Sequence, residues 1–225
     1  MTSRIRALTA LCLTLALLCA SASAELTVVK DSLVFFDGEN TATYSALVEN
    51  TGTAPAAPDA GTLTLFGPDG AAVLSESYVP TIPDSIVLQP GESVIVSYFL
   101  WSSALQDGAV TAWTYTPAEW SADYARPHTI IPCSSEIRDA GDGLTDIVVT
   151  FTNDTDGVLS NFVVTAAVLA EDGSLMLTES EHLHALGLEP GATVPDGIAI
   201  RGRDAADEDT KGQILAWLAG LDLEP

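Results

Sequence analysis

Carboxylates with the chemistry of a cation site gather in the second half of this 225-residue sequence. The set comprises Asp139, Asp142, Asp146, Asp154 and Asp156. We expect these aspartates to converge at one end of a β-domain, where their hard oxygen atoms would suit calcium. The spacing is not that of an EF-hand, however, and tight turns also require aspartate. Calcium is therefore one hypothesis, and the sequence indicates no other cofactor.

Two histidines, His182 and His184, are spaced to share one face of an extended segment. Glu179 and Glu181 stand beside them, and zinc accepts imidazole and carboxylate ligands. No further histidine or cysteine follows at ligand spacing. An exposed polar loop is therefore the simpler interpretation.

Nucleophilic chemistry has one candidate, Cys133, which follows His128 by five residues. A catalytic cysteine needs a base within hydrogen-bond reach and an oxyanion donor, and no motif here specifies either group. The sequence also contains no Gly-x-Ser-x-Gly elbow, phosphate-binding glycine loop or His-Glu-x-x-His motif. We therefore expect a protein that is not an enzyme.

Four aromatic residues form the candidate binding site: Trp113, Tyr115, Trp120 and Tyr124. Exposed together, they would form a platform that stacks on sugar rings or fills a pocket of a partner protein. Trp217 repeats Trp113 in the second half of the chain. Because core positions are often kept between copies, that repetition favours a core role for Trp113.

The elements that position these residues occur twice. Thr62–Val73 returns as Thr165–Met176, and each copy alternates apolar and polar residues into an Asp-Gly turn, as β-hairpins do. The two copies are offset by 103 residues, as are Thr43–Asn50 and Asp146–Asn153.

Two further matches lie toward the end of each copy. Leu88-Gln-Pro-Gly matches Leu188-Glu-Pro-Gly at an offset of 100, and Ala112-Trp113 matches Ala216-Trp217 at an offset of 104. Only the loops change length, so we interpret the chain as an internal duplication.

Alternation predicts which face of each strand is buried. In the first copy the inward positions include Ala42, Tyr44, Ala46 and Val48, then Leu63 and Leu65; in the second they include Ile147, Val149 and Phe151, then Ala166 and Val168. About seven short strands per copy favour two tandem immunoglobulin-like antiparallel β-sandwiches, with a barrel as the alternative. We expect a first strand at Leu26–Val29 and a last strand at Ile214–Leu218.

The predicted domains are residues 25–122 and 123–225. Pro117–Pro127 is the expected connector, and we expect the two domains to meet around its residues Trp120 and Tyr124.

Residues 1–24 have the pattern of a cleavable signal peptide. Arg4 and Arg6 precede the apolar run Ala7–Ala20, and Ala22-Ser23-Ala24 supplies small residues for cleavage. A retained N-terminal anchor is the alternative. Cleavage would leave a mature chain with no integral membrane segment. It would also leave one cysteine, Cys133, so no intramolecular disulfide could form, and this absence favours bacterial export.

The chain is strongly acidic. The predicted mature protein keeps 31 acidic residues against six basic ones, a net charge of −25. We expect no nucleic-acid partner, because phosphate binding needs a basic patch. Solubility explains the acidity most simply, and adaptation to saline surroundings is an alternative.

Three motifs carry a resemblance to a known family. Val-x-Asn-Thr-Gly, Leu-x-Leu-Phe-x-x-Asp-Gly and Leu-x-Pro-Gly-Glu follow one another within Tyr44–Glu92. This order resembles the FxLYD-type and related immunoglobulin-like domains of bacterial exported proteins. Ile147–Gly191 is similar but weaker, since Ala192 replaces Glu92. The resemblance implies fold and export, and it implies no catalytic residue.

Together these patterns predict an exported protein, secreted or peripherally associated with the cell envelope. The expected role is a module that binds an unidentified protein or glycan there. A structural spacer in an envelope assembly and a calcium-stabilised surface protein are the alternatives.

Overall fold

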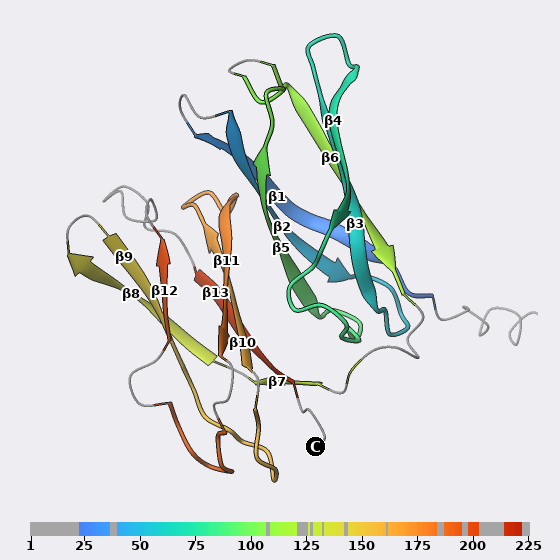
Figure 1. Cartoon of the computed structure of the whole chain (residues 1–225). Coiled ribbons are helices and arrows are strands. Elements are labelled where there is room, and N and C mark those ends of the chain that lie inside the picture. Colours follow the sequence, from blue (N-terminus) through green and yellow to red (C-terminus); the bar gives the residue numbers. More distant parts are fainter. Residues whose placement is uncertain are drawn as a thin grey trace, which may run out of the picture.

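The computed structural model describes residues 23–36, 40–106, 109–120, 126, 128–131, 133–141, 144–160, 162–183, 187–194, 198–202 and 214–221. Within these residues the chain is all-β, with antiparallel sheets and no helix, as the alternation predicts (Figure 1). The predicted signal peptide lies outside the described residues except for Ser23 and Ala24.

The strands of the N-terminal half are β1 (Leu26–Phe36), β2 (Thr41–Asn50), β3 (Pro58–Phe66), β4 (Ala72–Val79), β5 (Ser93–Trp101) and β6 (Ala112–Glu119). Those of the C-terminal half are β7 (His128–Ile131), β8 (Cys133–Gly141), β9 (Leu144–Phe151), β10 (Phe162–Leu169), β11 (Leu175–Leu183), β12 (Ile198–Gly202) and β13 (Ile214–Leu221).

In the N-terminal half, sheet β1-β2-β5 lies against sheet β4-β3-β6 around one apolar core. The expected inward positions of β2 are confirmed, because Ala42, Tyr44, Ala46 and Val48 are fully buried. Leu63 and Leu65 of β3 are buried with them. Burial of one face of each strand fixes its register, since a slip of one residue would expose that face.

The C-terminal half repeats this strand order. Sheet β8-β9-β12 corresponds to β1-β2-β5, and β11-β10-β13 corresponds to β4-β3-β6, with β7 added beside β13. Its core contains Val149 and Phe151 from β9 and Ala166 and Val168 from β10, as predicted. The burial of Ile147 is not among the features that the structure describes.

The two halves pack sheet against sheet. Core residues of β10 are even-numbered, yet the odd-numbered Val163, Thr165 and Ala167 are also buried, so this strand is covered on both faces. On β2 and β5, Leu47 and Ile95 point away from their own core and are buried as well. The four sheets are therefore stacked in layers, with β1-β2-β5 and the sheet of β10 and β11 in the middle (Figure 1).

Serine hydroxyls anchor this contact between the halves. The Ser32 hydroxyl donates to the backbone oxygen of Met176 at 3.0 Å, and Ser45 Oγ accepts the Thr178 N–H at 3.1 Å. The Thr178 hydroxyl donates to the carbonyl of Val96 at 2.6 Å. Strand β11 is at the edge of its sheet, so these bonds satisfy edge groups that would otherwise be open to another chain.

The sequence predicts that the two halves meet at the connector. The described contacts instead join β11 to β1, β2 and β5. Trp120 is 41% exposed, and Tyr124 lies outside the described residues. The connector is also shorter than predicted, because β6 continues through Pro117 to Glu119. At the other end, β1 continues to Phe36 rather than stopping at Val29.

A buried asparagine holds the loops together in each half. Asn50 Nδ2 donates to the carbonyls of Ala54 and Leu88 at 2.8 and 3.0 Å, while Oδ1 accepts the Gly52 N–H at 3.1 Å. Asn50 is fully buried, so these bonds replace the water that its amide loses.

Asn153 makes the corresponding bonds. Its Nδ2 donates to Gly157 and Leu188 at 2.8 Å, and its Oδ1 accepts the Thr155 N–H at 3.0 Å. In each half, one asparagine side chain thus bonds both the loop that follows it and the Leu-x-Pro-Gly motif. We call this arrangement the asparagine clamp.

Candidate functional site

Three of the four aromatic residues predicted as a platform are described, and they are not exposed together. Tyr115 is only 5% exposed, and its hydroxyl donates to the carbonyl of Val79 at 3.0 Å inside the core. Trp113 is partly buried against the same core. Tyr115 is therefore a core residue, because it has the inward phase of β6.

Trp113 and Tyr44 both donate to one carboxylate. Trp113 Nε1 lies 2.8 Å from Asp31 Oδ2, and the Tyr44 hydroxyl lies 3.2 Å from the same oxygen. Burial raises the pKa of Tyr44, and the negative charge of Asp31 raises it further. The Tyr44 hydroxyl therefore stays protonated and remains a donor. This arrangement joins β1, β2 and β6, and we assign it to stability.

Four of the five aspartates predicted for calcium are described, and they lie at two ends of one strand. Asp146 is the third residue of β9, whereas Asp154 lies three residues beyond its last residue, Phe151. From Asp146 to Phe151 alone the strand spans about 17 Å at ~3.3 Å per residue, whereas ligands of one calcium ion lie within about 2.6 Å of it. The backbone of Asp139 is beside the start of β9, opposite Thr145.

Asp154 and Asp156 are exposed in the loop that Asn153 organises, and Asp142 lies outside the described residues. The four described aspartates are therefore too far apart along β9 to bind one calcium ion together. More broadly, the described part of the chain contains no group of three or more histidine, cysteine or acidic residues arranged for a metal.

Of the histidine and cysteine candidates, His182 and Cys133 are among the described residues. His182 is exposed on β11, and His184 lies outside the described residues. Cys133 is partly buried at the start of β8, and burial raises the pKa of its thiol to about 11. Since the thiolate is the nucleophile, this environment opposes reactivity at neutral pH.

An exposed apolar surface is present elsewhere, on the outward face of β1-β2-β5. We call Val34, Phe36, Phe99 and Trp101 the aromatic shelf. Strand pairing arranges these residues in two rows across the sheet. One row is Val34, Thr43 and Phe99, and the next is Phe36, Thr41 and Trp101, with the threonine of β2 in the middle of each. The Phe36 and Phe99 rings are 6.4 Å apart between centroids.

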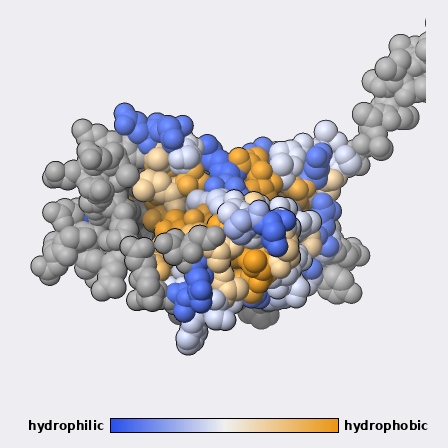
Figure 2. Space-filling model, turned by 90° about the horizontal axis from the view of Figure 1, so that it is seen from above, coloured by the Kyte–Doolittle hydropathy of each residue, from blue (hydrophilic) through white to orange (hydrophobic). Residues whose placement is uncertain are grey.

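The shelf is open to solvent. Trp101 is 83% exposed, Phe99 61%, Val34 45% and Phe36 38%. Seen from above, the molecule has apolar surface between its hydrophilic side chains (Figure 2). Apolar clusters of this kind mark interaction sites more often than scattered single residues do.

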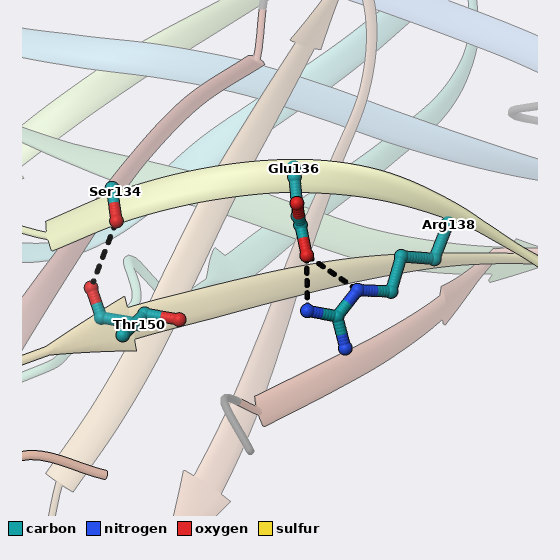
Figure 3. Close-up of polar contacts among 4 residues, drawn as sticks. All are labelled: Ser134, Glu136, Arg138 and Thr150. Atoms are coloured by element: carbon teal, nitrogen blue, oxygen red, sulfur yellow. Dashed lines mark hydrogen bonds and ion pairs between the residues drawn. The ribbon is translucent and has the colours of Figure 1, made fainter. Parts of the chain in front are cut away.

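In the C-terminal half, arginines stand at two of the corresponding strand positions. When the central strands β2 and β9 are aligned, Val34 matches Arg138 and Phe99 matches Arg201. Figure 3 shows Arg138 in an ion pair with Glu136, near Ser134, whose hydroxyl donates to the carbonyl of Thr150 at 3.5 Å. Both charged side chains are more than half exposed. The strand framework therefore accepts an exposed, charged Arg138 where the N-terminal half has Val34, so the shelf is not a requirement of this fold.

Sequence reasoning missed the shelf although a signal was present. Phe99 and Trp101 occupy the outward phase of β5, which also contains Ser93 and Ser97. Aromatic residues in the polar phase of a strand, with no aromatic residue at the matching position of the C-terminal half, are better binding candidates than Trp113, which Trp217 matches.

No protein-family model matches this chain, and no curated protein matches it significantly. Among the described residues, no helix has the length and apolar character needed to cross a membrane.

Proposed function

We propose that this chain is an exported, non-catalytic pair of immunoglobulin-like β-sandwiches that binds a protein or glycan partner at the cell envelope. The observation that carries the proposal is the aromatic shelf, where Trp101 and Phe99 are 83% and 61% exposed. A large exposed apolar cluster costs solubility, so its presence on a strongly acidic protein favours a binding role.

The duplicated architecture is supported by more than strand order. Gly67 N–H donates to Ala71 and Gly70 N–H to Gly67, both at 2.9 Å, and the same two bonds recur 103 residues later in the turn containing Gly173. Gly70 and Gly173 adopt φ of 76° and 80°, the left-handed conformation that glycine tolerates best. Matching turns, matching asparagine clamps and matching sheets support an internal repeat.

The non-catalytic part of the proposal is supported by the weakness of the alternatives. The pKa of Cys133, the single cysteine of the predicted mature chain, is raised. The described aspartates of the candidate calcium site are divided between two ends of β9. Export is supported by the signal-peptide pattern of residues 1–24.

A structural spacer is the second candidate. The buried Thr178, bonded to both Ser45 and Val96, favours a fixed relation between the two halves, as a spacer would need. A spacer does not need an exposed Trp101, however, so we place binding first.

Affinity capture tests the proposal. Residues 25–225 would be immobilised and exposed to an envelope extract of the source cells, in parallel with F99S/W101S and with W120S as a control. We expect one set of ligands to bind the wild type and W120S but not F99S/W101S. Equal capture by all three proteins would show that the shelf does not bind the partner.

A further inference from the structure

The aromatic shelf continues a surface that the protein already uses for packing. Ser32 and Ser45 lie in neighbouring strands and bond to β11, and Val34 and Thr43 follow two residues away on the same face. Ile95, also on this face, is fully buried, whereas Phe99 is 61% exposed. One part of the sheet is therefore covered by the C-terminal half, and the part immediately beyond it is open.

The open area fits a short segment better than a second copy of the chain. The fractional exposure of the four side chains corresponds to on the order of 400 Å² of accessible surface. A stable protein–protein interface buries about 800 Å² on each partner. In addition, two mature chains would each carry a net charge of −25, and this repulsion opposes self-association.

The charge balance selects a cationic partner. In the described part of the outward face, Lys30 is the one basic residue, and its ammonium already donates to the carbonyl of Gly173. Glu171 and Asp172 are exposed in the turn that Lys30 contacts. Ser174 donates its hydroxyl and its amide to Asp172, which lowers the pKa of that carboxyl and keeps it ionised. An acidic or strongly anionic ligand would be repelled.

The shelf also contains an unsatisfied acceptor. Thr41 lies between Phe36 and Trp101 in the strand register, and it is 7% exposed. Its hydroxyl has no hydrogen-bond partner among the described residues. A buried polar group without a partner is unfavourable, and an N–H donor entering between the two rings would satisfy it. Arginine combines several N–H donors with a planar cation that stacks on tryptophan.

We infer that the aromatic shelf docks a short extended segment of a partner protein that carries arginine or lysine beside apolar residues. The apolar side chains pack on Phe36 and Phe99, and a cationic side chain stacks on Trp101. This inference rests on the proposed binding function and specifies its partner as a basic polypeptide segment rather than a glycan.

Isothermal titration of residues 25–225 with defined probes tests the inference. The probes are a short peptide alternating arginine and leucine, the matched peptides with glutamate or serine in place of arginine, and a chitin oligosaccharide. We expect binding of the arginine peptide that weakens as salt is raised from about 50 to about 500 mM, because screening reduces the attraction between the acidic protein and the cation.

Variants separate the shelf from general attraction to an acidic protein. We expect W101S to weaken binding of the arginine peptide by about tenfold or more, since exposed aromatic anchors dominate such contacts. W120S, a second exposed tryptophan outside the shelf, should stay within about twofold of the wild type. Circular dichroism should show both variants folded, because each removes an exposed side chain.

Each other outcome contradicts the inference in a distinct way. Equal weakening by W101S and W120S, or weakening by neither, would remove the shelf as the docking site. Preferential, Trp101-dependent binding of the oligosaccharide or of the serine peptide would leave a binding module but exclude a cationic partner. Concentration-dependent dimers that W101S abolishes would make a second copy the occupant. No binding of the arginine peptide would overturn the inference outright.

Discussion

Replacement of Asn50 by alanine tests the clamp that closes the N-terminal half. The substitution removes four side-chain hydrogen bonds, to Ala54, Leu88, Gly52 and Glu25, and takes these partners from the part-buried carbonyl of Ala54 and N–H of Gly52. Each lost bond costs about 1 kcal/mol net, and more where a buried group stays unsatisfied, so we expect a loss of about 2–4 kcal/mol in the free energy of unfolding. Urea denaturation of residues 25–225, followed by far-UV circular dichroism, measures it.

Two further substitutions sharpen this test. Thr51→Ala removes only exposed hydrogen bonds, to Thr27 and Glu25, and should cost less than about 1 kcal/mol. Asn153→Ala should cost about as much as Asn50→Ala, because Asn153 also makes four side-chain hydrogen bonds, three of them to corresponding groups. A loss below about 1 kcal/mol for Asn50→Ala, or no difference from Thr51→Ala, would refute the clamp.

Asn50→Asp adds a pH dependence to the same position. An ionised carboxylate cannot donate to the carbonyls of Ala54 and Leu88, so folding should raise the pKa of the introduced group. A carboxyl with a raised folded-state pKa binds its proton more tightly in the folded state, so stability falls as pH rises through that pKa. We therefore expect Asn50→Asp to destabilise the protein more at pH 7 than at pH 4, whereas Asn50→Ala should show no such additional dependence.

Three other predictions concern the interface, the thiol and calcium. Ser45→Ala should cost about 1–3 kcal/mol by leaving the buried Thr178 N–H unsatisfied, whereas Ser134→Ala on the exposed equivalent face should be nearly neutral in calorimetry. Equal effects would contradict the packing of the two halves. Because the raised pKa of about 11 leaves about one thiol in a thousand ionised at pH 8, Cys133 should react with iodoacetamide about a hundredfold more slowly in the native protein than in urea. Rapid native labelling would show an accessible thiolate. Millimolar calcium should move the melting temperature by less than about 2 °C relative to chelator, since the aspartates are divided between two ends of β9. A large increase would reveal a site that these positions do not explain.

Much of the strand framework could be predicted from the sequence because its signals are local. Alternation identified Tyr44 and Leu65 as inward, and both are fully buried. The last strand was predicted at 214–218 by comparison with the first copy, and β13 covers Ile214–Leu221. Strand pairing and turn chemistry act over short distances along the chain, so the residues themselves contain the information.

The candidate site could be predicted only in part. Alternation gives Tyr115 the inward phase and Phe99 the outward phase, but it does not say which outward residues stay exposed. Leu47 and Ile95 have the outward phase and would be expected at the surface, but the C-terminal half covers them. Contacts between sheets far apart in sequence decide these cases, and local patterns do not encode them.

The location of the protein in the source cells tests the central claim, that it is exported and that its shelf binds a partner at the envelope. The source cells would produce the wild type, F99S/W101S or W120S at equal levels, and the mature protein would be measured in the envelope fraction and in the medium. We predict that the wild type and W120S stay with the envelope, whereas F99S/W101S is released in folded form. Retention of F99S/W101S at the wild-type level would contradict the account.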